Sequence, residues 1–366
     1  MIYTYYKNDE NYKTVKVFET FDKSEFYTYM VSLIESGEVM YDCMATYPSK
    51  EKQLQWFYED FQVRELTFYK HFSPGWVEVK EIDPNKNRDL YIREKLYKHY
   101  QEALQQGYEI FGIFVQGSQN YGLDMYSEEY WSDIDTKCIV LPSLDDIILN
   151  KKPISTTHER KNKEHIDFKD IRLMWDCFTK QNVNFMEILF TDYYIVPDKY
   201  LPYWNQMREM AEQITHAHPA QTVRTMSGMS MEKYKALEHR YPTIEWKIDK
   251  WGYDGKQLHH IIRINDFIRR YVAGMSFKEA MTPTSIMIPQ MNKAKLNKYS
   301  LPVARELAKK YDDDSKRIKE LFVTQYQNSE GKDIINQDIY DKMNEIKAEI
   351  IKKYLVENLK EEANEN

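Results

Sequence analysis

Two short runs between residues 114 and 141 have the residue types that phosphate chemistry uses. The first is the Gly117-Ser118 turn, which follows the apolar run FGIFV. Glycine permits a sharp bend, and a serine hydroxyl with a backbone N–H at the start of a helical segment favours phosphate oxygens. The second run is WSDIDTKCIVL, which contains Asp133 and Asp135. Taken alone, each has an ordinary interpretation, as a plain turn and as a solvated strand end.

The aspartate pair is expected to project from one face of a strand, because side chains two residues apart point the same way. Asp133 and Asp135 would then repel each other unless they shared a cation. The typical cation for such a pair is Mg²⁺, which is held by carboxylates together with substrate phosphates. We therefore expect a metal site here, with Ile134 facing the core.

A third carboxylate follows in KEHIDFKDIRLMWDCF, where His165, Asp167 and Lys169 are expected on one face of a short strand. Asp133, Asp135 and Asp167 together could hold two metal ions, predicted to be Mg²⁺ with Mn²⁺ as an alternative. Such ions activate an attacking hydroxyl, orient a triphosphate and neutralise the leaving pyrophosphate. Asp167 is also the candidate base, and the sequence leaves open whether it takes the proton or only holds metal.

A polar stripe is predicted on a helix at KQLHHIIR, where Lys256, His260 and Arg263 share one side. Lysine supplies a point charge, arginine a fork for phosphate oxygens and histidine a switchable donor, so the stripe could bind a triphosphate. The alternative is a solvated helix face with a structural histidine. His259 points elsewhere and is expected to be structural.

The elements that position these residues alternate between helix and strand. A helical pattern from residue 90 ends in Gly107, and the strand-like YEIFGIFV follows at once. Residues 1–88 combine short strand-like stretches with a helical stretch near residues 21–36. Near the C-terminus an apolar seam is expected to pack on the body of the protein or on a partner, and it consists of Ile339, Met343, Ile346 and Ile350.

These patterns predict an α+β protein with three domains. Residues 1–88 form an extra N-terminal α/β extension of unknown role, residues 89–200 form a core of mixed β-sheet with flanking helices, and residues 201–366 form a helical domain. A chain of 366 residues that is 42% hydrophobic and 14% aromatic can bury more than one core.

Composition excludes several classes of protein. The chain has three widely spaced cysteines, which rules out a disulfide framework and a CxxC metal site. It shows neither a long apolar run nor a signal peptide, so we expect a cytoplasmic protein with no membrane partner. A net charge of −7 argues against a broad nucleic-acid-binding surface. The basic segment 151–163 could still form a local site where a nucleic acid approaches.

The order of the motifs resembles the nucleotidyltransferase fold of the DNA polymerase beta superfamily. The residues that carry the resemblance are G-S-x-x-Y-G from Gly117, S-D-I-D from Ser132 and the later Asp167. The stretches QNVNFMEILF (181–190) and KQLHHIIR (256–263) resemble one branch, the RNA repair pathway DNA polymerase beta family of predicted nucleotidyltransferases. The resemblance covers residues 108–275. It departs at residues 123–131, where the stretch before the aspartates is longer than usual.

The resemblance implies transfer of a nucleoside monophosphate from an NTP such as ATP to an acceptor hydroxyl. An RNA or tRNA 3′ end is the leading acceptor. Two alternatives are nucleotidylation of a protein or small molecule, as in toxin, antitoxin or antibiotic-modifying relatives, and a non-catalytic nucleotide-binding scaffold. The predicted metal-binding and catalytic residues are Asp133, Asp135 and Asp167, and the predicted nucleotide-binding residues are Gly117, Ser118, Lys256, His260 and Arg263.

Overall fold

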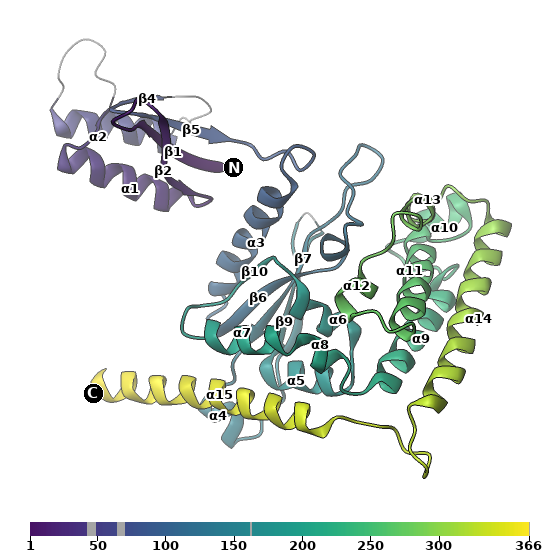
Figure 1. Ribbon diagram of the computed structural model, residues 1–366. Helices are drawn as coiled ribbons and strands as arrows, with labels where there is room; N and C mark the ends of the chain where they lie inside the picture. Colours follow the sequence, from purple (N-terminus) through teal and green to yellow (C-terminus); the bar gives the residue numbers. More distant parts are fainter. Residues whose placement is uncertain (42–48, 64–69, 162, 366) are drawn as a thin grey trace. The chain divides into compact units, whose positions relative to one another are not determined.

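The computed structural model of the chain (Figure 1) describes residues 1–41, 49–63, 70–161 and 163–365. It is a mixed α+β structure with two compact units, Met1–Lys98 and His99–Asn366. Among the described residues, no helix combines the length and apolar character needed to cross a membrane.

The first unit is a sheet packed against helices. Its described strands are β1 (Ile2–Asn8), β2 (Thr14–Thr20), β3 (Met40–Tyr41), β4 (Lys70–Ser73) and β5 (Trp76–Lys80), in the order β2-β1-β5-β4-β3. Helices α1 (Lys23–Ser36) and α2 (Lys50–Tyr58) pack on each other, and α2 continues into a π-helix, η1 (Glu59–Val63). The core is rich in aromatic rings, including Phe26, Phe57 and Phe61, all fully buried. The expected strands and helix of this region are therefore confirmed.

The second unit contains a mixed sheet in the order β10-β6-β7-β9-β8. Its strands are β6 (Ile110–Gln116), β7 (Asp135–Val140), β8 (Ser155–Glu159), β9 (His165–Asp170) and β10 (Tyr194–Ile195). β7 and β9 run parallel, and the other neighbours are antiparallel. β6 and β7 are buried along nearly their whole length, as expected for central strands, whereas the edge strand β8 is exposed throughout.

The helices around this sheet come from segments before and after its strands in the sequence. Helix α3 (Arg88–Leu104) precedes β6, and Gly107 adopts a left-handed conformation between them. Short elements follow the strands: η2 (Ser118–Tyr121), α4 (Leu144–Ile148), α5 (Ile171–Thr179), α6 (Val183–Met186) and η3 (Glu187–Phe190). Leu201 then begins the helical region, with α7 (Leu201–Glu209), α8 (Ala211–Thr215), α9 (Pro219–Ala236), α10 (Glu245–Trp251), α11 (Gly255–Val272), α12 (Phe277–Met281), α13 (Ile288–Lys295), α14 (Leu301–Gln325) and α15 (Gln337–Glu365).

The helical region and the sheet share one core. Helices α9, α11 and α14 pack on one another, and α11 also packs on α13. The C-terminal helix α15, yellow in Figure 1, runs past α5, α7 and α8. Its apolar seam is buried, and the Trp175 indole N–H donates to the Met343 carbonyl at 2.6 Å. The seam therefore packs on the body of its own unit.

The observed units differ from the expected domains in two places. The first unit ends at Lys98, inside α3, and not at residue 88. Residues 99–366 form one unit, so the sheet and the helices after residue 200 do not separate into two domains. The buried apolar side chains of α5, α7, α11 and α15 belong to one continuous cluster, which explains why they stay together.

Candidate functional site

A cavity of about 340 Å³ lies between the sheet and the helical region of the second unit. All eight residues predicted from the sequence line it. They are Gly117, Ser118, Asp133, Asp135, Asp167, Lys256, His260 and Arg263. They come from the end of β6, the start of β7, the middle of β9 and the first half of α11. The fold therefore brings together residues that are up to 146 positions apart, which shows their proximity and not yet their roles.

The turn after β6 has a conformation that only glycine adopts easily. Gly117 has φ 90° and ψ −148° and caps η2. Its N–H donates to the Glu187 carboxylate at 3.0 Å, and the Tyr121 hydroxyl donates to the other oxygen of the same group. The Gly117 amide is therefore already bound within the protein. Its contribution to a phosphate site is the bend that exposes Ser118 to the cavity.

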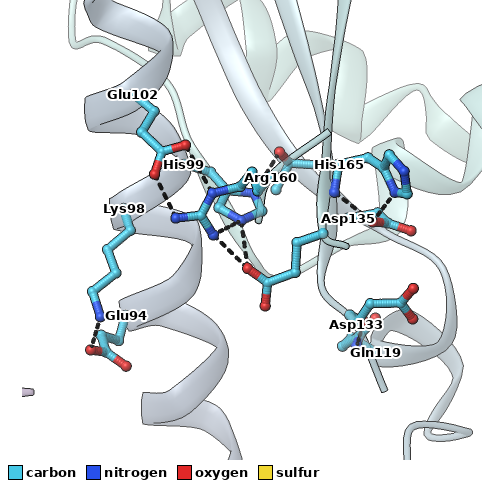
Figure 2. Close-up of polar contacts among 11 residues, drawn as sticks. Glu94, Lys98, His99, Glu102, Gln119, Asp133, Asp135, Arg160 and His165 are labelled. Atoms are coloured by element: carbon cyan, nitrogen blue, oxygen red, sulfur yellow. Dashed lines mark hydrogen bonds and ion pairs between the residues drawn. The ribbon is translucent and has the colours of Figure 1, made fainter. Parts of the chain in front are cut away.

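The aspartate pair lies where β7 begins. Asp133 precedes the strand, Ile134 is fully buried, and Asp135 is its first residue, so the expected alternation holds although the strand is shorter than predicted. Figure 2 shows Asp135 against His165, whose backbone N–H donates at 2.9 Å and whose Nδ1 lies at 3.2 Å. Burial and the neighbouring charge of Asp133 raise the pKa of Asp135. Two partly buried like charges therefore face one cavity.

The third aspartate lies in the same cavity but has different neighbours. Asp167 pairs in register with Lys137 on β7 and with Thr157 on β8. Its Oδ1 accepts from the Thr157 hydroxyl, and its Oδ2 accepts from Gln116 at 3.3 Å and lies 3.8 Å from the Lys137 ammonium. Within the described part of the chain, no three His, Cys, Asp or Glu side chains are grouped so that they could hold a metal ion. All three aspartates line one cavity, and metal binding by Asp167 stays a prediction.

The polar stripe of α11 forms the opposite wall of the cavity. Lys256 lies near Asp133 and Asp135. Burial alone would lower the Lys256 pKa, but the charges of Asp133, Tyr130 and Asp135 have the larger effect, so the pKa is raised. Arg263 is 7% exposed, and its guanidinium lies 4.5 Å from the Tyr121 ring centre. Its Nε has no hydrogen-bond partner among the described residues. Arg263 is therefore buried and not part of a solvated face, whereas Lys256 and His260 are partly exposed to the cavity.

The two histidines of α11 are neutral groups at the base of this wall. Burial, followed by His259, Arg263 and Lys256, lowers the His260 pKa well below its usual value. His259 is 3% exposed, its Nδ1 lies 3.1 Å from the Met291 carbonyl, and burial lowers its pKa to about 3. His259 is therefore packed within the protein, but it also lines the cavity and does not point elsewhere as expected.

The long stretch before the aspartates completes the cavity wall. An isolated bridge joins Tyr126 to Trp131, and Tyr130 lines the cavity. Lys295 of α13 anchors this stretch by donating to the Leu123 carbonyl at 3.0 Å, and its ammonium lies 4.5 Å from the Tyr130 ring centre. Burial and the neighbouring charge of Lys256 lower the Lys295 pKa to about 8. The stretch thus packs on a helix that is remote in sequence.

A second charged cluster lies on the other face of the sheet (Figure 2). Thr136 points away from the cavity and lies 3.0 Å from His99 Nδ1. Arg160 donates to Glu102 at 2.8 Å and also binds Glu164, and its Nη1 lies 2.9 Å from His99 Nε2. His99, Thr136 and Glu164 are all buried. This network is closed on itself, because each of its charged groups has a partner of opposite sign.

The basic segment 151–163 is only partly a loop, because residues 155–159 form β8. Lys151 pairs with Asp146 at 3.3 Å, and Arg160 belongs to the network of Glu102 and Glu164. Lys152 and Lys161 are exposed. The segment therefore offers fewer free cations than its composition suggests.

Several residues of the cavity wall were not predicted from the sequence, among them Lys137, Glu187 and Lys295. Lys137 stands two positions after Asp135, so the same alternation could have placed it on the same face. Glu187 interrupts the apolar run FMEILF, and a buried charge in such a run indicates a specific partner. For Lys295 the sequence carries no signal, because only the packing of α13 brings it to the cavity.

Comparison of the chain with models of protein families, with curated proteins and with solved structures finds no match.

Proposed function

We propose that this chain is a Mg²⁺-dependent nucleotidyltransferase of the DNA polymerase beta superfamily that acts in the cytoplasm on an RNA or tRNA 3′ end. One observation carries the proposal: the carboxylates of the sheet and the cations of α11 face each other across one cavity of about 340 Å³. A ligand that suits both walls carries negative phosphates for the cations and brings a metal ion for the carboxylates. A nucleoside triphosphate with its magnesium ion has both properties.

The donor set at the start of β7 fits a magnesium ion. Mg²⁺ is usually bound through one or two carboxylates, with substrate phosphates and water completing its octahedron. Asp133 and Asp135 supply two such carboxylates, and their repulsion is relieved when a cation is bound. When bound, the ion orients the triphosphate and neutralises charge on the leaving pyrophosphate. Mn²⁺ would serve as a substitute.

The basic wall would bind the triphosphate. Arg263 presents a buried guanidinium whose Nε lacks an acceptor, and leaving such a donor unpaired is costly. A phosphate oxygen would supply the missing acceptor. Lys256 adds a charge that the neighbouring aspartates favour, and neutral His260 donates one hydrogen bond without adding charge. Ser118 lines the same cavity from the turn after β6.

The transfer itself makes one bond and breaks one. The acceptor hydroxyl oxygen attacks the α-phosphorus, the bond between this phosphorus and the β-phosphate oxygen breaks, and pyrophosphate leaves with the electron pair. The hydroxyl proton passes to a base, and Asp167 is the candidate. A carboxylate offers about four acceptor positions, so Asp167 retains capacity beside its contacts with Thr157 and Gln116.

The assay that tests this proposal follows label from each NTP. The purified chain is incubated with Mg²⁺, each α-labelled NTP and either total RNA or a protein lysate, beside an Asp133→Ala/Asp135→Ala variant. We expect aspartate-dependent label in RNA. Label in protein would replace the RNA acceptor by a protein acceptor. If no transfer depended on the aspartates with any acceptor, the enzyme proposal would be wrong, and a nucleotide-binding scaffold would replace it.

A further inference from the structure

Lys137 lies beside Asp167, the third aspartate that the sequence predicted as a metal ligand. It projects from β7 on the same face as Asp135, and the parallel pairing sets it directly beside Asp167. Its ammonium lies 3.8 Å from Asp167 Oδ2, donates to the Gln116 side-chain oxygen and lies 4.9 Å from the Phe185 ring centre. The residue is only 5% exposed. A buried ammonium with these partners is fixed in place.

The two carboxylate positions of the cavity are therefore not equivalent. Asp167 is held from three sides, by Thr157, Gln116 and Lys137. Asp135 is held by His165 through one oxygen alone, and Asp133 makes no side-chain hydrogen bond within the described residues. The first position already contains a cation within the protein. The second is a pair of carboxylates that repel each other.

A metal ion at Asp167 would have to approach the Lys137 ammonium closely. In a site with low exposure, a divalent cation and an ammonium repel strongly, and the ion would also compete with Thr157 and Gln116 for the oxygens of Asp167. An ion between Asp133 and Asp135 meets weaker obstacles. Among the described residues, Lys256 lies near the pair but forms no ion pair with either carboxylate, and His165 occupies only one oxygen of Asp135.

We propose that this site takes one divalent cation, between Asp133 and Asp135, and that the Lys137 ammonium stands in place of a second ion beside Asp167. The inference rests on the proposed function, because it concerns the metal ions of the same triphosphate site. It replaces the expectation of two ions with one ion and one resident ammonium, and it makes Lys137 a positioning residue for Asp167.

The test counts metal ions per bound nucleotide in the full chain. The chain is dialysed to equilibrium with Mn²⁺ and, in turn, the α,β-methylene analogue of each NTP, which cannot react at the α-phosphorus. Retained Mn²⁺ is measured by electron paramagnetic resonance and retained nucleotide by absorbance. We expect one Mn²⁺ per nucleotide in the wild-type chain. Two ions per nucleotide would overturn the proposal, and so would the absence of retained Mn²⁺ with every analogue.

Substitutions assign the effect to the ammonium. Lys137→Met should raise the ratio from one to two, because it removes the resident cation and leaves Asp167 able to bind metal, whereas Lys137→Arg should keep it at one. The matched control is Lys169→Met. Lys169 lies on the same face of β9 as Asp167, but its ammonium donates to the Ser155 hydroxyl at 2.7 Å. This control should keep the ratio at one. A ratio of one in folded Lys137→Met, checked by circular dichroism, would contradict the proposal.

These outcomes separate the inference from the proposed function. Two ions per nucleotide together with aspartate-dependent transfer would remove the role of Lys137 and leave the nucleotidyltransferase intact. No retained nucleotide and no aspartate-dependent transfer would remove both.

Discussion

Each face of the mixed sheet carries a cluster of charged residues, and the two clusters differ in whether their charges are paired. On one face, Arg160 is paired with Glu102 and Glu164, and His99 and Thr136 complete a closed network. On the other face, Asp133 and Asp135 repel each other, and Arg263 of α11 has an N–H without a partner. Both clusters are supported by β7, whose alternate side chains point to the two faces.

The difference shows how a ligand site can be told from a structural network. Buried polar groups are normally satisfied within the protein, and a satisfied network stabilises the fold. Unsatisfied charges on opposite walls of a cavity cost stability and are relieved only by a ligand. Perturbed groups of this kind concentrate at functional sites. Substitutions on the two faces should therefore have opposite effects on activity and on stability.

The largest expected effect is the loss of activity on the cavity face. Asp135→Asn should lower nucleotidyl transfer by about 10²–10³-fold, the scale on which removal of one preorganised charge-stabilising group acts. The assay is label transfer from the NTP. The exposed Asp192→Asn, a matched aspartate whose side chain is 69% exposed, should stay near the wild-type rate. Equal losses in both variants would argue against a site at Asp135.

The same Asp135→Asn variant should unfold at a higher temperature than the wild type at pH 7. The pKa of Asp135 is raised by burial and by Asp133, so its folded pKa lies above the unfolded value. Its contribution to stability is present below the unfolded pKa and is lost as the pH rises through the folded pKa. At pH 7 the charge therefore costs stability, which asparagine avoids. Differential scanning calorimetry at pH 7 and pH 4 measures this, and the difference between variants should shrink at the lower pH.

A substitution in the paired network on the other face of the sheet should lower stability and leave activity unchanged. Glu164→Gln removes one member of a buried pair and should cost about 3 kcal/mol of unfolding free energy, because Arg160 and His99 lose their shared partner. Transfer activity per folded molecule should stay close to the wild type. Urea unfolding gives the free energy, and the exposed Glu159→Gln serves as the control, expected within about 0.5 kcal/mol. A loss of activity without loss of stability would contradict this comparison.

Glu187 combines features of the two clusters. It is buried and both oxygens of its carboxylate accept hydrogen bonds, yet it lines the cavity. Glu187→Gln should cost about 1–3 kcal/mol, since the Gly117 N–H and the Tyr121 hydroxyl lose a charged acceptor. Tyr121→Phe removes only one of these bonds and should cost less. Both are measured by urea unfolding. A smaller cost in Glu187→Gln than in Tyr121→Phe would show that Glu187 does not anchor the turn.

The smallest expected effect is a pH dependence of nucleotide binding. The pKa of Lys295 is lowered to about 8, so the cavity loses a positive charge as the pH rises through that value. Affinity for a triphosphate should fall by up to about tenfold between pH 7 and pH 9, since a charged hydrogen bond contributes roughly 1.5–3 kcal/mol. Lys295→Met should bind more weakly at pH 7 and lose this dependence. Isothermal titration at both pH values measures it.

Much of the second unit could be predicted from local patterns. The alternation around Ile134 and Phe168 indicated β7 and β9, and the spacing of apolar residues between 256 and 263 indicated α11. These signals are strong because burial on one face imposes the period of the element on the sequence. The domain boundaries were harder to predict, because the apolar faces of the later helices do not reveal that they share one core with the sheet.

The sequence by itself determined which residues are available for chemistry: two aspartates that alternate around a buried isoleucine, a third on a later strand, and a basic stripe on a helix. Their gathering around one cavity, the buried setting of Arg263 and the approach of Lys295 were decided only by tertiary packing. The register of β7 and β9 set Lys137, and not another carboxylate, beside Asp167. The physical reason is that hydrogen bonding between strands distant in sequence fixes which side chains are neighbours, and no local pattern encodes that pairing.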